Sequence, residues 1–352
     1  MYYLNPNVET LNRVFDQNKR EGYLRLDLNE NPGGLPDALI SKVLEDISPE
    51  FVSQYPETLE FTTMLANYLN AELENICLVN GSAEGIRYII EAFTSPNGKI
   101  VGVSPSYAMF EVYAKMYGRT FIPVEYTSSL DMPIENIIKK LDEDVELLIL
   151  LNPNNPMGNV YTRDEMQYLL DMAEKMEITV LIDEAYYYFY PETFIDFALN
   201  RKHVFVTRTF SKLFSMAGCR LGYVVGWPEG IQSVQKLCTP HNVNAFALKF
   251  AEAVIETDGM IEQLTALYSE GKSFLTAELD KRKYVYNCKE GNFIFIKPKT
   301  DANTLVQRMK DEKKILIKTY NGIGALDTCL RVTIGEKKYM QQFLTALDEL
   351  DL

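Results

Sequence analysis

Between about residues 60 and 225, short apolar runs rich in β-branched residues alternate with longer amphipathic segments. Several of the runs are apolar at nearly every position, as strands buried on both faces should be. The five predicted strands cover Lys99–Val103, Glu146–Leu151, Ile178–Ile182, His203–Thr207 and Leu221–Gly226. Strands that alternate with helices form parallel sheets joined by crossover helices. The pattern therefore predicts an α/β fold.

A helix is predicted over Arg163–Lys175, between the second and third strands. Its apolar residues lie on one side, and Thr162 followed by Glu165 has the spacing of a capping box. The two signals together place the start of this helix at Arg163.

Beyond about residue 245 the pattern changes, and a second, smaller α+β domain is predicted. A long helical stretch to about Leu279 comes first. It is followed by strand-like Asn292–Lys297, a helix over Ala302–Met309, and strand-like Lys314–Lys318 and Cys329–Ile334. We therefore expect an N-terminal segment, 1–44, that packs on the small domain, a large domain, 45–245, and a small domain, 246–352.

The composition excludes several classes of protein. With 49 acidic against 35 basic residues the formal charge is −14, which argues against a general binder of nucleic acid or anionic membranes. Five scattered cysteines indicate reduced thiols, and the two histidines lack metal-ligand spacing, so no metal site is expected. No leader or membrane-spanning run is evident. We expect a cytoplasmic protein.

Lys212 is the first candidate for chemistry. Ser211 and Thr209 place hydroxyls close before it, and Arg220 follows eight residues later. A lysine is most often a surface residue, but hydroxyls and a planar guanidinium suit a phosphate, and an amine beside them suits a Schiff base with pyridoxal phosphate.

Polar strings follow three successive predicted strands. They are Asn152–Gly158, Asp183–Tyr186 and Thr209–Lys212. Ligands of parallel sheets bind beyond the carboxyl ends of the strands, so these strings should face one crevice.

Each further residue has a functional and a structural interpretation. Asp183 could pair with a pyridine nitrogen or simply end a strand, and Asn155 and Tyr186 could contact a phenolic oxygen, although asparagine in a proline-rich turn is usually turn chemistry. Tyr107 could stack on a ring or belong to the core. The turn Gly81–Gly85 opens a predicted helix and could bind phosphate through free N–H groups.

In order along the chain, these motifs resemble the pyridoxal-phosphate-dependent aminotransferases of fold type I, class I/II, and among them the histidinol-phosphate aminotransferase family. The resemblance covers nearly the whole chain. Its motifs are Leu28–Pro32, Gln54–Glu57, Gly81–Gly85, Asn152–Gly158, Asp183–Tyr186, Ser211–Lys212 with Arg220, Asn242–Asn244, Gly291–Phe293 and Leu330–Gly335.

The resemblance implies a mainly parallel seven-stranded sheet and assigns roles to residues. Lys212 would be the Schiff-base lysine and proton-transfer base, and Asp183 would hold the pyridine nitrogen. Asn155 and Tyr186 would contact the phenolic oxygen, and Tyr107 would stack on the ring. The phosphate would be held by Arg220, Ser211, Thr209 and the backbone of Ser82, Ala83 and Glu84. Tyr55 would reach the neighbouring site of a homodimer, and Arg331 would bind the substrate carboxylate, with Asn155 and Tyr55 also near the substrate.

The chain departs from the family pattern at Gly33–Gly34, where a larger residue usually follows Asn-Glu-Asn-Pro, so its specificity stays open. The implied reaction moves an amino group from glutamate or a similar donor to a small phosphorylated keto substrate. Threonine-phosphate decarboxylases share the motifs, so decarboxylation of a phosphorylated amino acid is the alternative. A non-catalytic binding or regulatory protein on the same fold is a third, disfavoured by the presence of Lys212 and Asp183.

Overall fold

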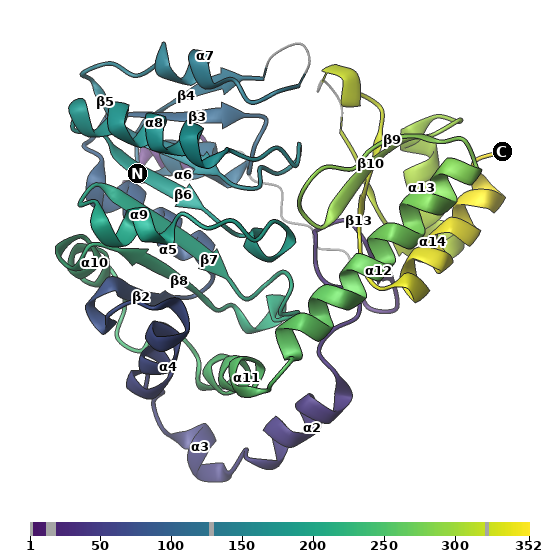
Figure 1. Cartoon of the computed structure of the whole chain (residues 1–352), viewed down its shortest axis with the longest axis horizontal. Coiled ribbons are helices and arrows are strands. Elements are labelled where there is room, and N and C mark those ends of the chain that lie inside the picture. Colours follow the sequence, from purple (N-terminus) through teal and green to yellow (C-terminus); the bar gives the residue numbers. More distant parts are fainter. Residues whose placement is uncertain (1–2, 12–18, 127–129, 321–323) are drawn as a thin grey trace.

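The structure is a computed structural model that describes residues 3–11, 19–126, 130–320 and 324–352. It contains two main β-sheets side by side, each flanked by helices (Figure 1). None of the helices in the described ranges is long and apolar enough to span a membrane.

The larger sheet has seven strands in the order β2-β8-β7-β6-β5-β3-β4. All pairs from β7 to β4 are parallel, whereas β8 is antiparallel to both of its neighbours. The predicted α/β fold with a mainly parallel seven-stranded sheet is thus confirmed. The strands are β2 (Ile76–Val79), β3 (Lys99–Ser104), β4 (Thr120–Glu125), β5 (Val145–Leu151), β6 (Thr179–Asp183), β7 (Val204–Thr209) and β8 (Gly222–Gly226).

Helices cover both faces of this sheet, with α8 and α9 in front of it and α5 and α6 behind it in the view of Figure 1. The predicted helix Arg163–Lys175 is α8, and its capping box forms: Thr162 N donates to Glu165 Oε2 at 2.8 Å. The helices of this layer are α4 (Leu59–Leu69), α5 (Ser82–Phe93), α6 (Met109–Met116), α7 (Ile134–Ile138), α8 (Arg163–Lys175), α9 (Ile195–Asn200) and α10 (Pro228–Gln235).

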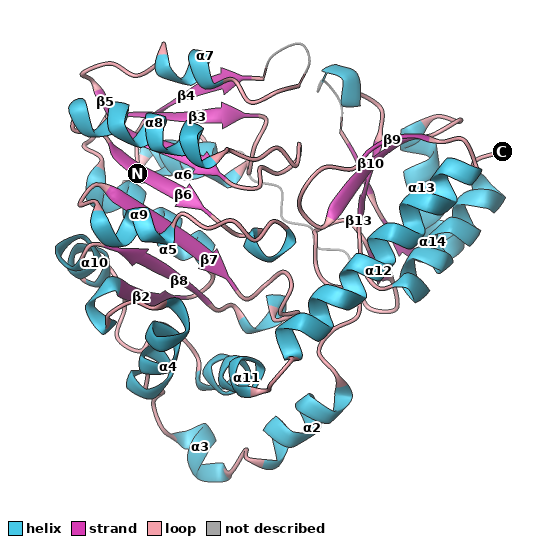
Figure 2. Cartoon of the chain, in the orientation of Figure 1, coloured by secondary structure: helices cyan, strands magenta, loops and turns pink. Residues whose placement is uncertain are grey.

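The smaller sheet has four antiparallel strands in the order β12-β13-β10-β9. Figure 2 shows it in magenta beside three helices. These strands are β9 (Val285–Asn287), β10 (Phe293–Lys297), β12 (Lys318–Thr319) and β13 (Leu330–Thr333), and the helices are α12 (Met260–Lys281), α13 (Ala302–Lys313) and α14 (Lys337–Leu350).

The helical stretch predicted up to Leu279 is two helices, α11 (Ala245–Glu256) and α12. Gly259 separates them with a φ of +73°, a left-handed conformation that glycine adopts without strain. This break was not predicted.

The N-terminal segment contacts both halves of the molecule. Its strand β1 (Leu24–Arg25) pairs in parallel with β11 (Ile315–Leu316), and Thr333 N donates to Leu26 O at 2.8 Å, so this part lies against the small sheet. The short helix α1 (Pro6–Glu9) instead contacts α6 of the large layer. The helices α2 (Asp37–Glu45) and α3 (Pro49–Ser53) follow, and we keep the three-part division of the chain as a proposal.

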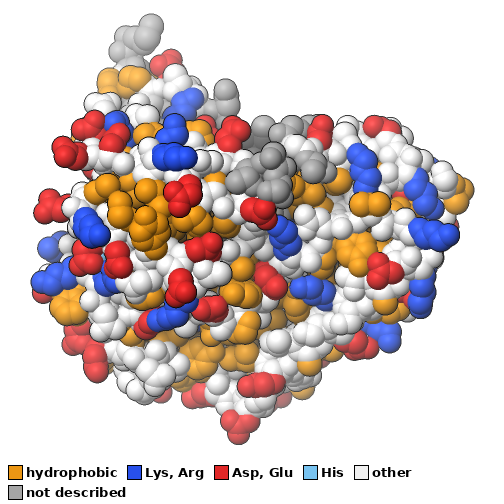
Figure 3. Space-filling view, turned by 45° about the horizontal axis from the view of Figure 1, so that its top comes forward, with side chains coloured by type: hydrophobic (Ala, Val, Ile, Leu, Met, Phe, Trp, Pro, Cys, Tyr) orange, Lys and Arg blue, Asp and Glu red, His pale blue; other side chains and the backbone are white. Residues whose placement is uncertain are grey.

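The surface mixes charges of both signs. On the face in Figure 3, acidic and basic side chains are interspersed around apolar areas, and the described residues form no continuous basic field there.

Candidate active site

The carboxyl ends of β5, β6 and β7 lie next to one another at the sheet edge that faces the smaller sheet (Figure 1). In the register of these strands Leu151 is opposite Asp183, and Asp183 is opposite Thr207. The polar strings that follow the three strands therefore meet at one edge, where parallel sheets bind ligands.

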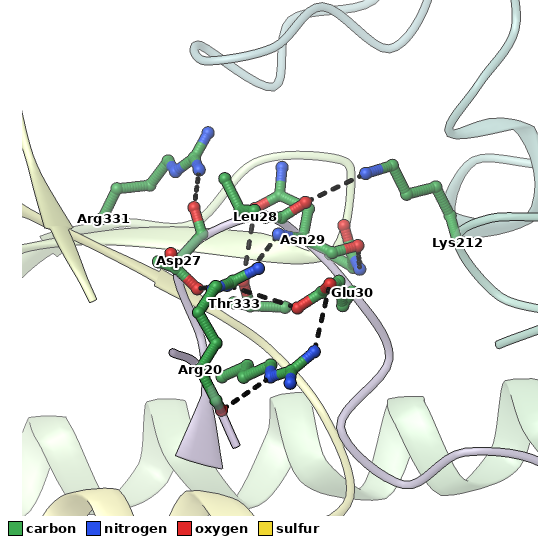
Figure 4. A network of polar contacts seen from close by, with 10 residues as sticks. Arg20, Asp27, Leu28, Asn29, Glu30, Lys212, Arg331 and Thr333 are labelled. Carbon is green, nitrogen blue, oxygen red and sulfur yellow. Dashed lines mark hydrogen bonds and ion pairs between the residues drawn. The ribbon is translucent and has the colours of Figure 1, made fainter. Parts of the chain in front are cut away.

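Lys212 lies three residues beyond the end of β7. Its Nζ donates to Leu28 O at 3.0 Å, as Figure 4 shows, and is 5.6 Å from the centre of the Tyr186 ring. Burial lowers the pKa of Lys212 to about 8; the Arg331 guanidinium acts in the same direction and Glu30 opposes it. An amine with this pKa is partly neutral near physiological pH and can act as a nucleophile or base.

Asp183 is the last residue of β6 and is only 2% exposed. Its Oδ1 accepts hydrogen bonds from Thr207 Oγ1 at 3.0 Å and from Ala185 N at 3.2 Å. Burial raises the pKa of Asp183 to about 7, although both hydrogen bonds favour the ionised form. A cationic group bound next to Asp183 would therefore lower the pKa of this carboxyl and pair with its ionised form.

The Tyr186 hydroxyl is the centre of a buried polar network. It accepts hydrogen bonds from Asn155 Nδ2 at 3.1 Å and Asn29 Nδ2 at 2.9 Å. Asn155 Oδ1 in turn accepts from Arg331 Nη1 at 3.0 Å. Burial raises the pKa of Tyr186 to about 12, so the phenol keeps its proton at neutral pH.

Arg331 lies on β13 and is 3% exposed. Its Nη2 donates to Asp27 O, as Figure 4 shows. Within the described ranges no salt bridge joins this guanidinium to a carboxylate, and its buried Nε has no hydrogen-bond partner. A buried guanidinium without a counter-ion is costly unless an anion binds it. The side chain is therefore suited to an anionic ligand.

A second cationic group lies at the start of α5. Arg220 Nη1 is 3.4 Å from Ser211 Oγ, and the Ser211 hydroxyl in turn accepts from Thr209 Oγ1 at 2.9 Å. A Cβ on Gly81 would lie 2.4 Å from Arg220 Nη2, so any larger residue would push this guanidinium away from its present position beside the turn. The absence of the side chain also permits the Gly81 φ of +80°.

The helix α5 adds backbone donors to this position. It begins at Ser82, and Gly81, which lies against Arg220, provides no side-chain cap. The first N–H groups of the helix, those of Ser82 and Ala83, and the positive end of its dipole are therefore available to an anion. Glu84 N already donates to Gly81 O at 3.0 Å, and the Glu84 carboxylate accepts from Asn80 N at 2.7 Å. Ser82 and Ala83 are thus the better placed of the three predicted donors.

The two remaining aromatic candidates lie in different places. Tyr107 is half-buried against Phe110, and burial raises its pKa, with Asp183 acting in the same direction and Arg220 opposing it. Its ring therefore lies within electrostatic reach of the crevice. Tyr55 is 77% exposed and stacks on His241, with ring centres 4.4 Å apart.

Sequence reasoning missed three polar residues of the crevice. Asn29, Thr207 and Thr333 are all buried, and each hydrogen-bonds a member of the network. Asn29 belongs to the motif Leu28–Pro32, but the sequence suggested no role for it. Thr207 is the last residue of a predicted strand, and the pattern of a strand does not show which of its side chains face a site. These three residues are recognised as part of the site only by their hydrogen bonds in the structure.

The chain resembles characterised proteins along nearly its whole length. Residues 21–347 match the family model described as aminotransferase class I and II. The histidinol-phosphate aminotransferase of Thermoanaerobacter sp. (strain X514) is 31% identical over 331 residues, which cover 93% of this chain and 92% of that protein.

Two solved structures share the fold. The histidinol-phosphate aminotransferase of Clostridium acetobutylicum superposes with a TM-score of 0.83 at 27% identity, covering 93% of this chain and 99% of that one. The enzyme of the same name from Sinorhizobium meliloti, in complex with pyridoxal-5'-phosphate, has a TM-score of 0.89 at 19% identity and covers 99% and 98% of the two chains. At 19% identity, the similarity to the Sinorhizobium meliloti structure shows a shared fold and nothing more.

Proposed function

The chain belongs to the aminotransferase class I and II family, and from this we propose that it moves an amino group from glutamate or a similar donor to a small phosphorylated keto substrate. It is a pyridoxal-phosphate-dependent enzyme similar to histidinol-phosphate aminotransferases. The observation that carries the proposal is the buried guanidinium of Arg331, which has no carboxylate partner among the described residues and lies near enough to Lys212 to lower the pKa of its amine.

The residues of the crevice fit pyridoxal phosphate. Arg220, the Ser211 hydroxyl and the first N–H groups of α5 offer donors beside Gly81, where a Cβ would meet Arg220, and this donor set suits the phosphate. Asp183 suits the pyridine nitrogen, because a protonated nitrogen would hold this carboxyl in its ionised form. When bound, the cofactor supplies an electron sink for the bond that breaks at the substrate α-carbon.

The remaining residues orient the reactants and move the proton. We assign to Lys212 Nζ the covalent attachment of the cofactor and the transfer of the α-proton, because its lowered pKa keeps part of the amine neutral. We assign to Asn155 and Tyr186, which hydrogen-bond each other, contacts with the phenolic oxygen, and to Tyr107 packing against the ring. Arg331 would bind the substrate anion through its bidentate fork.

We further propose a homodimer in the cytoplasm. Tyr55, at 77% exposure, and the exposed Val52 and Leu59 lie in and after α3, outside the crevice of their own chain, and suit a second copy whose site Tyr55 completes. The five free thiols are consistent with a reducing compartment.

The test is the first half of the reaction. Protein loaded with pyridoxal phosphate is mixed with glutamate, and we expect the visible absorbance to fall while one equivalent of 2-oxoglutarate appears per site. Imidazole-acetol phosphate should then restore the absorbance. Carbon dioxide release from a phosphorylated amino acid, with no response to glutamate, would instead establish the decarboxylase.

A matched variant checks the role of Arg331. Arg331→Gln removes the charge but keeps a hydrogen-bond donor for Asn155, so we expect the half-saturating glutamate concentration to rise at least about tenfold. An unchanged value would exclude Arg331 from substrate binding.

A further inference from the structure

Asn29 reaches the crevice from the N-terminal segment. It is 1% exposed and has a φ of +57°, a left-handed conformation that asparagine tolerates. Its backbone is fixed on both sides, because Asn29 N donates to Thr333 Oγ1 at 3.1 Å and Asn29 O accepts from Asn292 Nδ2 at 3.1 Å. Figure 4 shows the segment that carries it lying between Arg331 and Lys212.

The side chain of Asn29 donates the second of two hydrogen bonds that the Tyr186 hydroxyl oxygen accepts. That oxygen accepts from Asn29 Nδ2 at 2.9 Å and from Asn155 Nδ2 at 3.1 Å. A phenolic oxygen has one proton and a limited acceptor capacity. With both amides donating to it, the hydroxyl must donate its own proton to a third group.

Strand β13 fixes the direction of the Asn155 amide and supports that of the Asn29 amide. Arg331 can only donate, so Asn155 turns its oxygen to Arg331 Nη1 and its NH₂ to Tyr186. Asn29 Oδ1 lies 3.3 Å from Thr333 Oγ1, which leaves its NH₂ toward Tyr186. Arg331 and Thr333 are two residues apart and therefore lie on the same face of β13.

We propose that Asn29 is a positioning residue which, together with Asn155, directs the phenolic proton of Tyr186 toward the phenolic oxygen of the cofactor. The inference rests on the proposed function, since it presumes that pyridoxal phosphate occupies the crevice. A hydrogen bond donated to that oxygen draws electron density from the ring, so the group formed by the cofactor and Lys212 binds its proton less tightly.

The test measures the pH midpoint of the visible absorbance of the loaded protein without substrate. Asn29→Gly removes the amide and keeps the left-handed backbone. We expect the midpoint to rise by on the order of one pH unit, the shift that the loss of a hydrogen bond to a charged group produces. In a Tyr186→Phe background the same substitution should cause no further shift, because Asn29 acts through the hydroxyl.

A second variant reverses the polarity of the contact. Asn29→Asp is nearly isosteric but only accepts, so the Tyr186 hydroxyl should donate its hydrogen bond to the introduced carboxylate, and the midpoint should shift at least as far as in Tyr186→Phe. It also carries the test if Asn29→Gly does not fold. Asn31→Ala is the control: it removes the 2.7 Å bond from Asn31 Nδ2 to Ser215 Oγ in the same segment without touching Tyr186, and should leave the midpoint unchanged.

The proposal would be overturned if Asn29→Gly shifted the pH midpoint equally in the wild-type protein and in the Tyr186→Phe variant. It would also be overturned if Asn29→Gly left the midpoint unchanged while still unfolding cooperatively, as a folded protein does. A wild-type protein that binds no pyridoxal phosphate would overturn the proposed function itself. The two failures are therefore distinguishable.

Discussion

At the scale of single residues, the site raises the pKa of its acid, Asp183, and lowers the pKa of its base, Lys212. Burial raises the pKa of Asp183 to about 7 and lowers that of Lys212 to about 8. Groups that would be fully charged in water thus titrate near neutral pH. Such shifts are typical of groups that do chemistry, and they are unusual for a strand end or a surface lysine.

The raised pKa of Asp183 predicts a pH-dependent stability of the cofactor-free protein. The folded state favours the protonated carboxyl, so its contribution to the free energy of unfolding is present below pH 4 and is lost as the pH rises through 7. Asp183→Asn does not titrate. Its stability relative to wild type should therefore increase by about 2–4 kcal/mol between pH 4 and pH 7.5, and change little above that.

Urea denaturation of both proteins at several pH values checks this expectation. A constant stability difference across the range would mean that Asp183 is ionised in the free protein, and the proposed reason for its affinity for a pyridine nitrogen would fall.

The residue types of the site could be predicted from the sequence, but their partners could not. Lys212, Asp183 and Arg220 follow strand ends or stand at recognisable spacings. The link from Arg331 through Asn155 to Tyr186 joins residues 176 and 31 positions apart, and no local pattern encodes it. The contact of Asn29 with Tyr186 spans 157 positions and depends on how the N-terminal segment packs.

At the scale of elements, the turn from β2 into α5 brings a guanidinium to the start of a helix. The turn works because Gly81 has no side chain: an added Cβ would lie 2.4 Å from Arg220 Nη2. Gly222, at the start of β8, allows a similar approach, since its Cβ would lie 2.5 Å from Ser82 N. Two glycines thus bring the donors of the anion site together.

Gly81→Ala should displace Arg220 and weaken binding of pyridoxal phosphate at least about tenfold, the loss of roughly one charge-assisted hydrogen bond. Gly259→Ala is the matched control, because Gly259 has a similar φ of +73° but nothing within 4 Å of an added Cβ. Both substitutions strain the backbone, and only the first should change the dissociation constant measured by fluorescence titration. Equal effects would show that strain alone accounts for the loss.

Strands and helices with a clear hydrophobic or capping pattern in the sequence were predicted well, whereas those without such a pattern were missed. The near-continuous apolar runs of β5 and β6 and the capped helix α8 lie within a residue of their predicted ranges. Strand β4 was missed because it is an edge strand with Pro123 in its middle and Val124 as its only buried residue. The division of the chain at residues 44 and 245 stays a prediction.

At the scale of the whole molecule, the proposed role of Tyr55 requires a second copy of the chain. The exposed apolar residues between α2 and α4, with Phe246 of α11 packed edge-on against Phe51, form a surface that a monomer would leave in water. We expect the two-chain assembly to bind the cofactor more tightly than one chain alone, because Tyr55 would add a contact to the neighbouring phosphate.

Leu59→Asp places a charge in this surface at a side chain that is 68% exposed in the single chain. We expect the mass measured by light scattering to fall from that of two chains to that of one, and the affinity for pyridoxal phosphate to fall several-fold. Val285→Asp, at 74% exposure on the edge strand β9, is the control and should change neither. A wild-type protein that is monomeric at micromolar concentration would contradict the proposed role of Tyr55.

In the proposed function, Lys212 attaches the cofactor at this edge of the large sheet. Borohydride reduction of the loaded protein fixes the cofactor on its lysine, and peptide mass spectrometry then locates it. We expect one phosphopyridoxyl group per chain, on the peptide that contains Lys212, and none on that peptide in Lys212→Ala. A label on another lysine, or no label on the wild-type protein, would contradict it.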